Sequence, residues 1–244
     1  MANNTQPKKW KKTEFSKGFL VHEIINPNND SNGIRKYFYK NKPAYRITLN
    51  SKLAQQLAGY ALIEKDLRST IIWLETIEKM QEGIKIVKGG SISNDREKFN
   101  VIKGLYVASL IFYGKCFTKC EGRNAQLSHK NVDEKFIKLH MEIMKQRHNF
   151  AAHSGAEKIE SVKVSLVFPQ QRNAHHIFDI FTELDQPDVF NLIEDLKFIE
   201  LVRHQYDIAR KKINELRQLI IERDLKEKNI DEWIRLGKKS LKKF

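Results

Sequence analysis

The sequence predicts a mainly α-helical protein with one small β-hairpin and a long C-terminal helix. Apolar residues recur every three or four positions along residues 53–84, 99–116 and 189–220, which is the period of an amphipathic helix. Only residues 160–183 change to the alternation of β-strands. With 244 residues, 41% of them hydrophobic, the chain is long enough for one large domain with a substantial core.

The N-terminal fifth of the chain is expected to be a basic extension, residues 1–48. It contains ten basic and three acidic side chains, with aromatic residues between them. Basic side chains neutralise phosphates and aromatic rings stack on unpaired bases, so this composition suits single-stranded RNA. It equally suits a solubilising arm whose aromatic rings attach it to the helical core. The candidate RNA-binding residues are Lys8, Lys9, Trp10, Lys11, Lys12, Arg35 and Lys36.

The predicted helical domain covers residues 49–228, and its helix ends have recognisable sequence patterns. Gly89 and Gly90 are expected to end the first helix. Asn94 followed by Glu97 resembles a capping box and opens the second helix. A third helix is predicted from the same spacing further on, where Asn131 precedes Glu134, with a buried face formed by Phe136, Leu139, Ile143 and Phe150.

The hairpin predicted for residues 160–183 places His175 and His176 in its loop. After it, Pro187 and Asp188 have the character of a helix start, so a final helix is expected to run to about residue 228. Residues 229–244 are again basic and are predicted to be a frayed tail.

The formal net charge of +14 favours an acidic partner, and RNA is the expected one. Cys116 and Cys120 lie one helical turn apart in an apolar helix, which is typical of reduced, buried thiols. Together with His129 and His140 they match no standard zinc spacing, so neither a metal nor another cofactor is expected. There is no apolar targeting segment and no apolar run long enough for a membrane helix, so a cytoplasmic protein is expected.

Residue types that act in catalysis are concentrated in one stretch, residues 145–155, with the sequence KQRHNFAAHSG. Arg147 is followed directly by His148 and, six positions on, by His153, just before a serine and a glycine that suit a helix end. Arginine keeps its charge and presents a fork of donors to phosphate oxygens. Histidine, with a pKa near ~6.5, can exchange protons at neutral pH. These three residues are the candidate catalytic residues.

This stretch resembles the R-x4-6-H motif of the HEPN superfamily, helical endoribonucleases of toxin–antitoxin, abortive-infection and antiviral defence systems. The resemblance covers roughly residues 50–225, although only the motif is specific. It implies a HEPN-like helical bundle and a homodimer whose motif helices meet at the twofold axis. It further implies metal-independent cleavage of RNA, either tRNA or mRNA, through the ribose 2′-hydroxyl, and regulation by an antitoxin or another defence-system protein.

Alternatives to this interpretation stay open. Arg147 can be solvated or paired with Glu142 or Glu157, and a histidine in a last helical turn is favoured by the helix dipole in any case. At the level of function, the chain can be a HEPN-like dimer without catalysis that binds a nucleotide, RNA or a protein partner. It can also be an unrelated helical protein that binds nucleic acid through residues 1–48.

Overall fold

The computed structural model describes residues 9–15, 19–24, 34–82, 86–87, 90–91, 95–151, 161–170, 179–185 and 197–241. The chain forms two compact units. Residues 52–219 form one unit, called the helical unit below, and residues 1–51 together with 220–244 form the other, called the terminal unit. Both ends of the chain therefore belong to the same unit.

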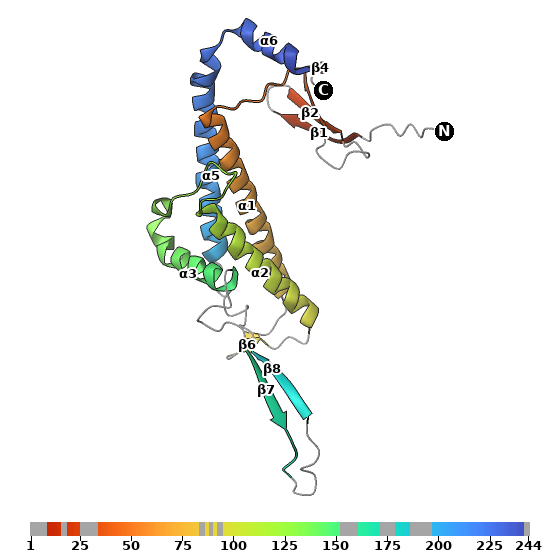
Figure 1. Ribbon diagram of the computed structural model, residues 1–244, viewed down its shortest axis with the longest axis vertical. Coiled ribbons are helices and arrows are strands. Elements are labelled where there is room, and N and C mark those ends of the chain that lie inside the picture. Colours follow the sequence, from red (N-terminus) through yellow and green to blue (C-terminus); the bar gives the residue numbers. More distant parts are fainter. Residues whose placement is uncertain are drawn as a thin grey trace, which may run out of the picture. The chain divides into compact units, whose positions relative to one another are not determined.

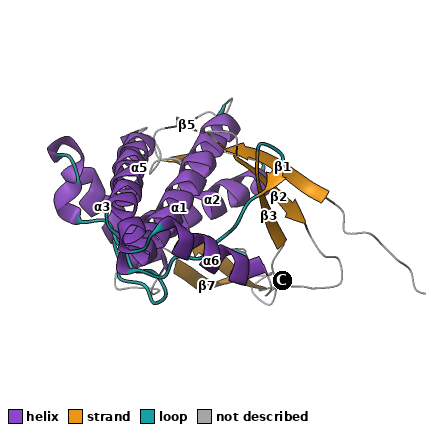
Figure 2. Cartoon of the chain, turned by 90° about the horizontal axis from the view of Figure 1, so that it is seen from above, coloured by secondary structure: helices purple, strands orange, loops and turns teal. Residues whose placement is uncertain are grey.

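The helical unit is built from helices, most of which run alongside one another while one, Glu134–Ala151, lies across them in Figure 1; Figure 2 draws them in purple. The prediction of a mainly helical protein with a long C-terminal helix is confirmed. The helices are α1 (Lys52–Gln81), α2 (Arg96–Cys116), α3 (Glu134–Ala151) and α5 (Lys197–Glu222), the last of which ends in the terminal unit. A short strand pair, β5 (Ile86–Val87) and β6 (Gly90–Ser91), lies between α1 and α2.

The helix ends differ from the sequence predictions by a few residues. The side chain of Asp95, rather than Asn94, caps α2 by accepting a hydrogen bond from the Lys98 amide at 2.9 Å. Before α3, the carboxylate of Asp133 accepts from the Lys135 amide. Asn131 instead ends a short 3-10 helix, η2 (His129–Asn131). Aspartate and asparagine are about equally good caps, so neighbouring candidates are decided by the path of the chain.

The predicted end of the first helix is wrong, and the predicted start of the last helix lies outside the described residues. Helix α1 stops at Gln81, well before the pair Gly89 and Gly90; β5 lies between, and Gly90 itself is the first residue of β6. The expected start of the last helix at Pro187 lies outside the described residues, and α5 is described from Lys197.

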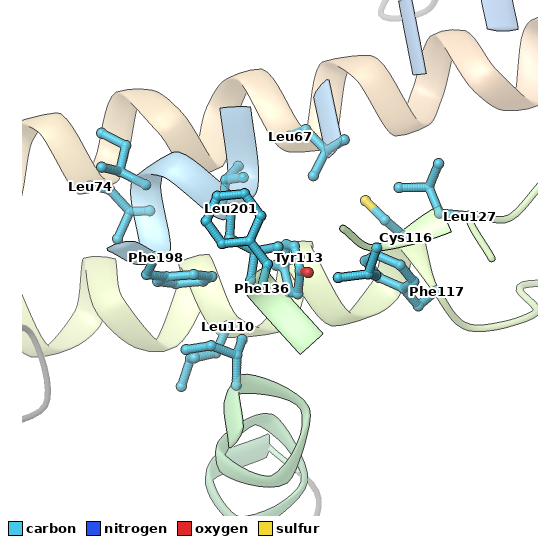
Figure 3. Packing of buried hydrophobic residues seen from close by; sticks show 14 of the residues in the cluster. Leu67, Leu74, Leu110, Tyr113, Cys116, Phe117, Leu127, Phe136, Phe198 and Leu201 are labelled. Carbon is cyan, nitrogen blue, oxygen red and sulfur yellow. The ribbon is translucent and has the colours of Figure 1, made fainter. Parts of the chain in front are cut away.

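The core of the helical unit lies where α1, α2, α3 and α5 meet (Figure 3). Leu67 and Leu74 from α1, Leu110 and Tyr113 from α2, and Leu201 from α5 are all at most 5% exposed. Aromatic rings pack edge to face in it, since the rings of Tyr113 and Phe198 are 5.5 Å apart at 85°. Burial of this apolar face, not helix propensity, accounts for most of the helical stability.

A buried ion pair attaches the loop after α2 to α1. Asp66 in α1 is 1% exposed, and its Oδ2 lies 3.6 Å from Nη1 of Arg123, whose side chain is 3% exposed. Arg123 also donates hydrogen bonds to the carbonyl oxygens of Lys115 and Thr118 near the end of α2. The guanidinium of Arg123 thus supplies hydrogen bonds to carbonyls at the end of α2. It also neutralises the carboxylate of Asp66, whose burial as an unpaired charge would be unfavourable.

The predicted hairpin is present, as β7 (Ser161–Val167) and β8 (Asp179–Asp185) paired antiparallel. His175 and His176, which were expected in its loop, lie outside the described residues. The cross-strand pairs Val164–Thr182 and Leu166–Ile180 alternate with the pairs Lys163–Glu183 and Ser165–Phe181. One face of the ribbon is therefore apolar. This face is solvent-exposed, with Val164 70% and Ile180 64% exposed.

The terminal unit contains a sheet that the sequence analysis did not predict. Its four antiparallel strands have the order β1-β2-β3-β4, and β1 to β3 are drawn in orange in Figure 2. Residues 1–48 are thus not a plain extension. Leu20 and Val21 are consecutive residues of β2 and therefore lie on opposite faces of the sheet, yet both are buried, at 8% and 6% exposure. The strands are β1 (Lys9–Phe15), β2 (Phe19–Ile24), β3 (Ile34–Tyr39) and β4 (Lys42–Pro43).

The basic C-terminal segment is a helix, α6 (Ile230–Leu241), and not the predicted frayed tail. A 3-10 turn, η4 (Asp224–Glu227), connects it to α5. The indole N–H of Trp233 donates to the carbonyl of Leu225 at 3.1 Å, and the side chain of Asn229 accepts from the Glu232 amide at the start of α6. These bonds define the turn and the helix start.

We predict that Arg123→Ala lowers the free energy of unfolding by about 3 kcal/mol, because it leaves the Asp66 carboxylate buried without its main buried cation. The matched control is Arg68→Ala, which removes an exposed pair between Arg68 Nε and Glu64 at 3.1 Å and is expected to cost less than about 1 kcal/mol. Urea titration measures both. Equal costs for the two variants would contradict a structural role of the buried pair.

Candidate functional site

The motif helix α3 holds two of the three predicted catalytic residues. Arg147 is half-buried and His148 is exposed. His153 lies outside the described residues, two positions beyond the end of α3 at Ala151. The structure therefore fixes the arginine side of the motif, and the geometry between Arg147 and His153 stays a prediction.

Arg147 lies against a glycine of the neighbouring helix. A Cβ atom placed on Gly114 of α2 would be 2.9 Å from Cγ of Arg147 and 3.0 Å from its Cδ. Any side chain at position 114 would therefore push the arginine stem away from α2. The absence of a side chain at Gly114 lets the aliphatic part of Arg147 pack directly on the α2 backbone.

The surroundings of the guanidinium leave it poorly neutralised. Nε of Arg147 is buried and has no hydrogen-bond partner among the described residues. Nor does an ion pair with Glu142 form, although the sequence made that pair an alternative; Glu157 lies outside the described residues. A cation that is held by packing rather than by a carboxylate can offer its charge to an incoming anion, and phosphate is the anion that the guanidinium fork fits best.

Two hydrogen bonds from α2 hold α3 in register. The hydroxyl of Tyr106 donates to Oε1 of Gln146 at 2.6 Å, directly beside Arg147. Six residues earlier in α3, Nδ1 of His140 lies 2.7 Å from the hydroxyl of Tyr113. Both tyrosine rings are fully buried, so these bonds join the two helices from within the core.

His140 continues this second bond to the surface. Its Nε2 lies 2.7 Å from Nδ1 of His129, an exposed residue of η2. The tautomers follow from the donors available: Tyr113 donates to His140 Nδ1, so His140 carries its proton on Nε2 and donates to His129. If His140 Nδ1 instead donated to Tyr113, the buried Tyr113 hydroxyl would have no acceptor for its own proton among the described residues. The ring of Phe117 packs on both imidazoles.

This histidine pair was missed as a unit by sequence reasoning, which considered it only with the cysteines as zinc ligands. Burial, with His129 beside it, lowers the pKa of His140 to about 4, so His140 is neutral at physiological pH. Burial raises the pKa of Cys116 to about 12, which keeps this thiol protonated. Among the described residues, no group of three or more His, Cys, Asp or Glu side chains is placed to hold a metal ion.

The predicted RNA-binding residues that the structure describes lie on β1 and β3, the two strands that flank β2 in the N-terminal sheet. Lys9, Trp10, Lys11 and Lys12 belong to β1, Arg35 and Lys36 belong to β3, and Lys8 lies outside the described residues. The register brings them together across β2. Lys12, His22 and Lys36 occupy one row of the sheet, and Lys11, Glu23 and Arg35 occupy the next. The sheet thus gathers basic positions that are 24 residues apart in the chain.

The chain matches no family model, and no curated protein or solved structure matches it. In the part of the chain that the structure describes, no helix is long and apolar enough to cross a membrane.

We predict that stability falls as the pH is lowered from about 6.5 to 4, because His140 has a lower pKa in the folded chain than in the unfolded one. Above pH ~6.5 both states hold it neutral, and the stabilisation is complete. Below that, the unfolded state gains a proton first, and up to about 3 kcal/mol is lost by pH 4. Denaturant titrations across this range should show a shallower fall for His140→Gln. Parallel profiles would contradict the assignment.

Proposed function

We propose that this protein is a metal-independent endoribonuclease of the HEPN type that acts as a toxin or phage-defence effector. The observation that carries the proposal is the half-buried Arg147, seated on Gly114 without an ion pair among the described residues, in a motif that has His153 six positions on. Of the two pairings that would neutralise the arginine, the one with Glu142 is absent among the described residues, and Glu157 lies outside them.

The proposed chemistry divides between the two motif residues. The guanidinium of Arg147 binds the non-bridging oxygens of a phosphodiester and stabilises the charge that develops in the transition state. His153 takes the proton of the ribose 2′-hydroxyl, and the 2′-oxygen then attacks the phosphorus. The bond from phosphorus to the 5′-oxygen breaks, and a protonated histidine returns a proton to this oxygen, which leaves as a hydroxyl. A second copy of the chain supplies the other Arg and His, because the resemblance implies a site at a twofold axis. His148 is assigned a secondary role in holding the RNA.

We predict that Arg147→Ala and His153→Ala each reduce cleavage of total cellular RNA by at least about 100-fold, since each removes one charge-stabilising or proton-transferring group. Both also relieve growth arrest on expression. Stability should change by about 1 kcal/mol or less, because both are polar residues and Arg147 is not part of the core cluster. His148→Ala has a milder effect. Gel analysis of RNA incubated with each purified variant measures the activity.

Two further variants sharpen this test. Lys138→Ala removes an exposed positive charge from the same helix and should leave cleavage unchanged. Gly114→Ala keeps Arg147 but displaces its stem, so cleavage should fall although both motif residues are intact. Equal cleavage by the wild type and the Arg147→Ala variant would overturn the proposed function.

A second candidate function is that of a non-catalytic dimeric module, and the exposed apolar face of the β7–β8 hairpin favours it. Val162, Val164, Leu166 and Ile180 are each at least 58% exposed. A two-stranded ribbon is marginal in water by itself and becomes stable with more strands or a covered face. The occupant proposed is the same hairpin in a second copy of the chain, because joining two identical ribbons gives four strands and covers both apolar faces.

For this candidate, we predict that Val164→Asp weakens self-association at least about tenfold, because a charge on the covered face must be desolvated. The matched control is Val167→Asp, the same change on the opposite face of the same strand. Sedimentation equilibrium measures both. If the two variants associate like the wild type, or if all are monomers, the hairpin does not join two copies; its apolar face would then be covered within the chain or by another protein.

A further inference from the structure

The terminal unit contains most of the net positive charge of the protein. Residues 1–51 and 220–244 include 18 of the 44 basic side chains but only 8 of the 30 acidic ones, which gives +10 of the total +14. We propose that the terminal unit is a binding platform for single-stranded RNA, formed jointly by the N-terminal sheet and helix α6. This proposal deepens the proposed function and rests on it for the identity of the ligand, because it locates where the RNA is captured rather than where it is cut.

Helix α6 is fixed to the chain that follows the sheet. The hydroxyl of Ser240 donates to the carbonyl oxygen of Arg46 at 2.7 Å. A Cβ atom on the buried Gly237 would lie 2.7 Å from Cβ of Tyr45, so the helix backbone packs directly on this tyrosine. The two residues between these contacts, Lys238 and Lys239, are exposed. Their charges are thus held on a helix beside a basic segment, where they act together on a polyanion.

An exposed aromatic pair on the sheet supplies a stacking surface. Phe19 of β2 and Tyr39 of β3 are register partners whose ring centroids are 4.9 Å apart. Both remain 42–43% exposed. The ammonium of Lys40 lies 5.5 Å from the centre of the Tyr39 ring. Aromatic faces next to cations are what unpaired bases and their phosphates require, whereas a duplex keeps its bases stacked away from such a surface.

The backbone at Lys40 supports a role for its charge. Lys40 and Asn41 have φ angles of 45° and 61°, and they form the two-residue turn between β3 and β4. Asparagine and glycine are the favoured residues in such a turn, and lysine is strained there. The turn thus holds the lysine side chain beside Tyr39 at a conformational cost that asparagine would not incur.

An anionic membrane is the main competing ligand for a basic amphipathic helix. Insertion into lipid requires a free apolar face, and in α6 part of that face is already occupied. Gly237 packs on Tyr45 and the Trp233 indole N–H is bound to the Leu225 carbonyl, while Ile230 and Ile234 stay exposed. The exposed Phe19–Tyr39 pair and the partial occupation of α6 together favour RNA.

The experiment measures binding of a labelled oligouridine of about 12 nucleotides by fluorescence anisotropy, at salt concentrations from about 50 to 200 mM. All proteins are full-length and contain Arg147→Ala, so that no cleavage occurs. Lys238→Gln combined with Lys239→Gln should weaken binding about tenfold at the lowest salt and reduce the salt slope by about 1.4, the value for two phosphate contacts on a single strand. The matched control combines Lys138→Gln with Lys211→Gln, two exposed lysines of the helical unit, and should change neither.

Two single variants separate stacking from charge. Tyr39→Leu should weaken binding about tenfold at every salt concentration and leave the slope unchanged, because it removes a stacking surface and no charge. Lys40→Asn should keep or raise the melting temperature, since asparagine tolerates the turn, and still weaken binding. A purely structural role of Lys40 would not give this combination.

Three outcomes would overturn the platform. The control pair loses as much affinity for oligouridine as the Lys238 and Lys239 pair, or the Lys238 and Lys239 variant has the same salt slope as the parent Arg147→Ala protein. The third is binding to phosphatidylserine vesicles without binding to oligouridine. These outcomes are separate from those that decide the proposed function. Cleavage that does not depend on Arg147 or His153 rejects the nuclease and leaves the platform standing. Unchanged oligouridine binding rejects the platform and leaves cleavage untouched.

Discussion

The close contact between α3 and α2 at Gly114 is the constraint on which the candidate site depends. It places the stem of Arg147 on the backbone of α2, and the hydrogen bond from Tyr106 to Gln146 fixes the register of α3 beside it. The second bond, from Tyr113 to His140, ties the same two helices deeper in the core. Because all of these contacts lie on rigid helices, the orientation of the arginine is determined by the fold rather than by a loop.

The helical unit and the terminal unit differ in composition in a way that matches the two tasks proposed for them. The helical unit contains the core, the buried Asp66–Arg123 pair and the motif, with a net charge of only +4. The terminal unit is smaller and strongly basic, and it presents exposed aromatic rings. Long-range attraction of a polyanion and chemistry at a single phosphate place different demands on a protein, since the first needs many exposed charges and the second needs one positioned charge.

Sequence reasoning predicted the elements with a strong period and missed those without one. The helices were recognisable because burial on one face imposes a repeat on the apolar residues, and the β7–β8 hairpin was recognisable from the alternation of its apolar residues, although these are exposed. The N-terminal sheet was missed because lysines occupy much of β1, as is common on edge strands, and obscure any alternation. Helix α6 was missed because its basic residues suggested a solvated tail. The motif was enough to predict Arg147 as a site residue. Its packing on Gly114 could not be predicted, because that contact joins residues 33 positions apart in the sequence.

The central claim is that RNA is cut through its own 2′-hydroxyl without a metal ion. The most direct measurement is the chemistry of the product ends after incubation of a defined RNA with the purified protein in EDTA, alongside the same RNA with a 2′-O-methyl group at the cleavage position. The account predicts cleavage in EDTA that leaves a 2′,3′-cyclic phosphate and a 5′-hydroxyl, and no cleavage of the methylated RNA. Products with a 3′-hydroxyl and a 5′-phosphate, or cleavage that requires a divalent cation, would contradict it.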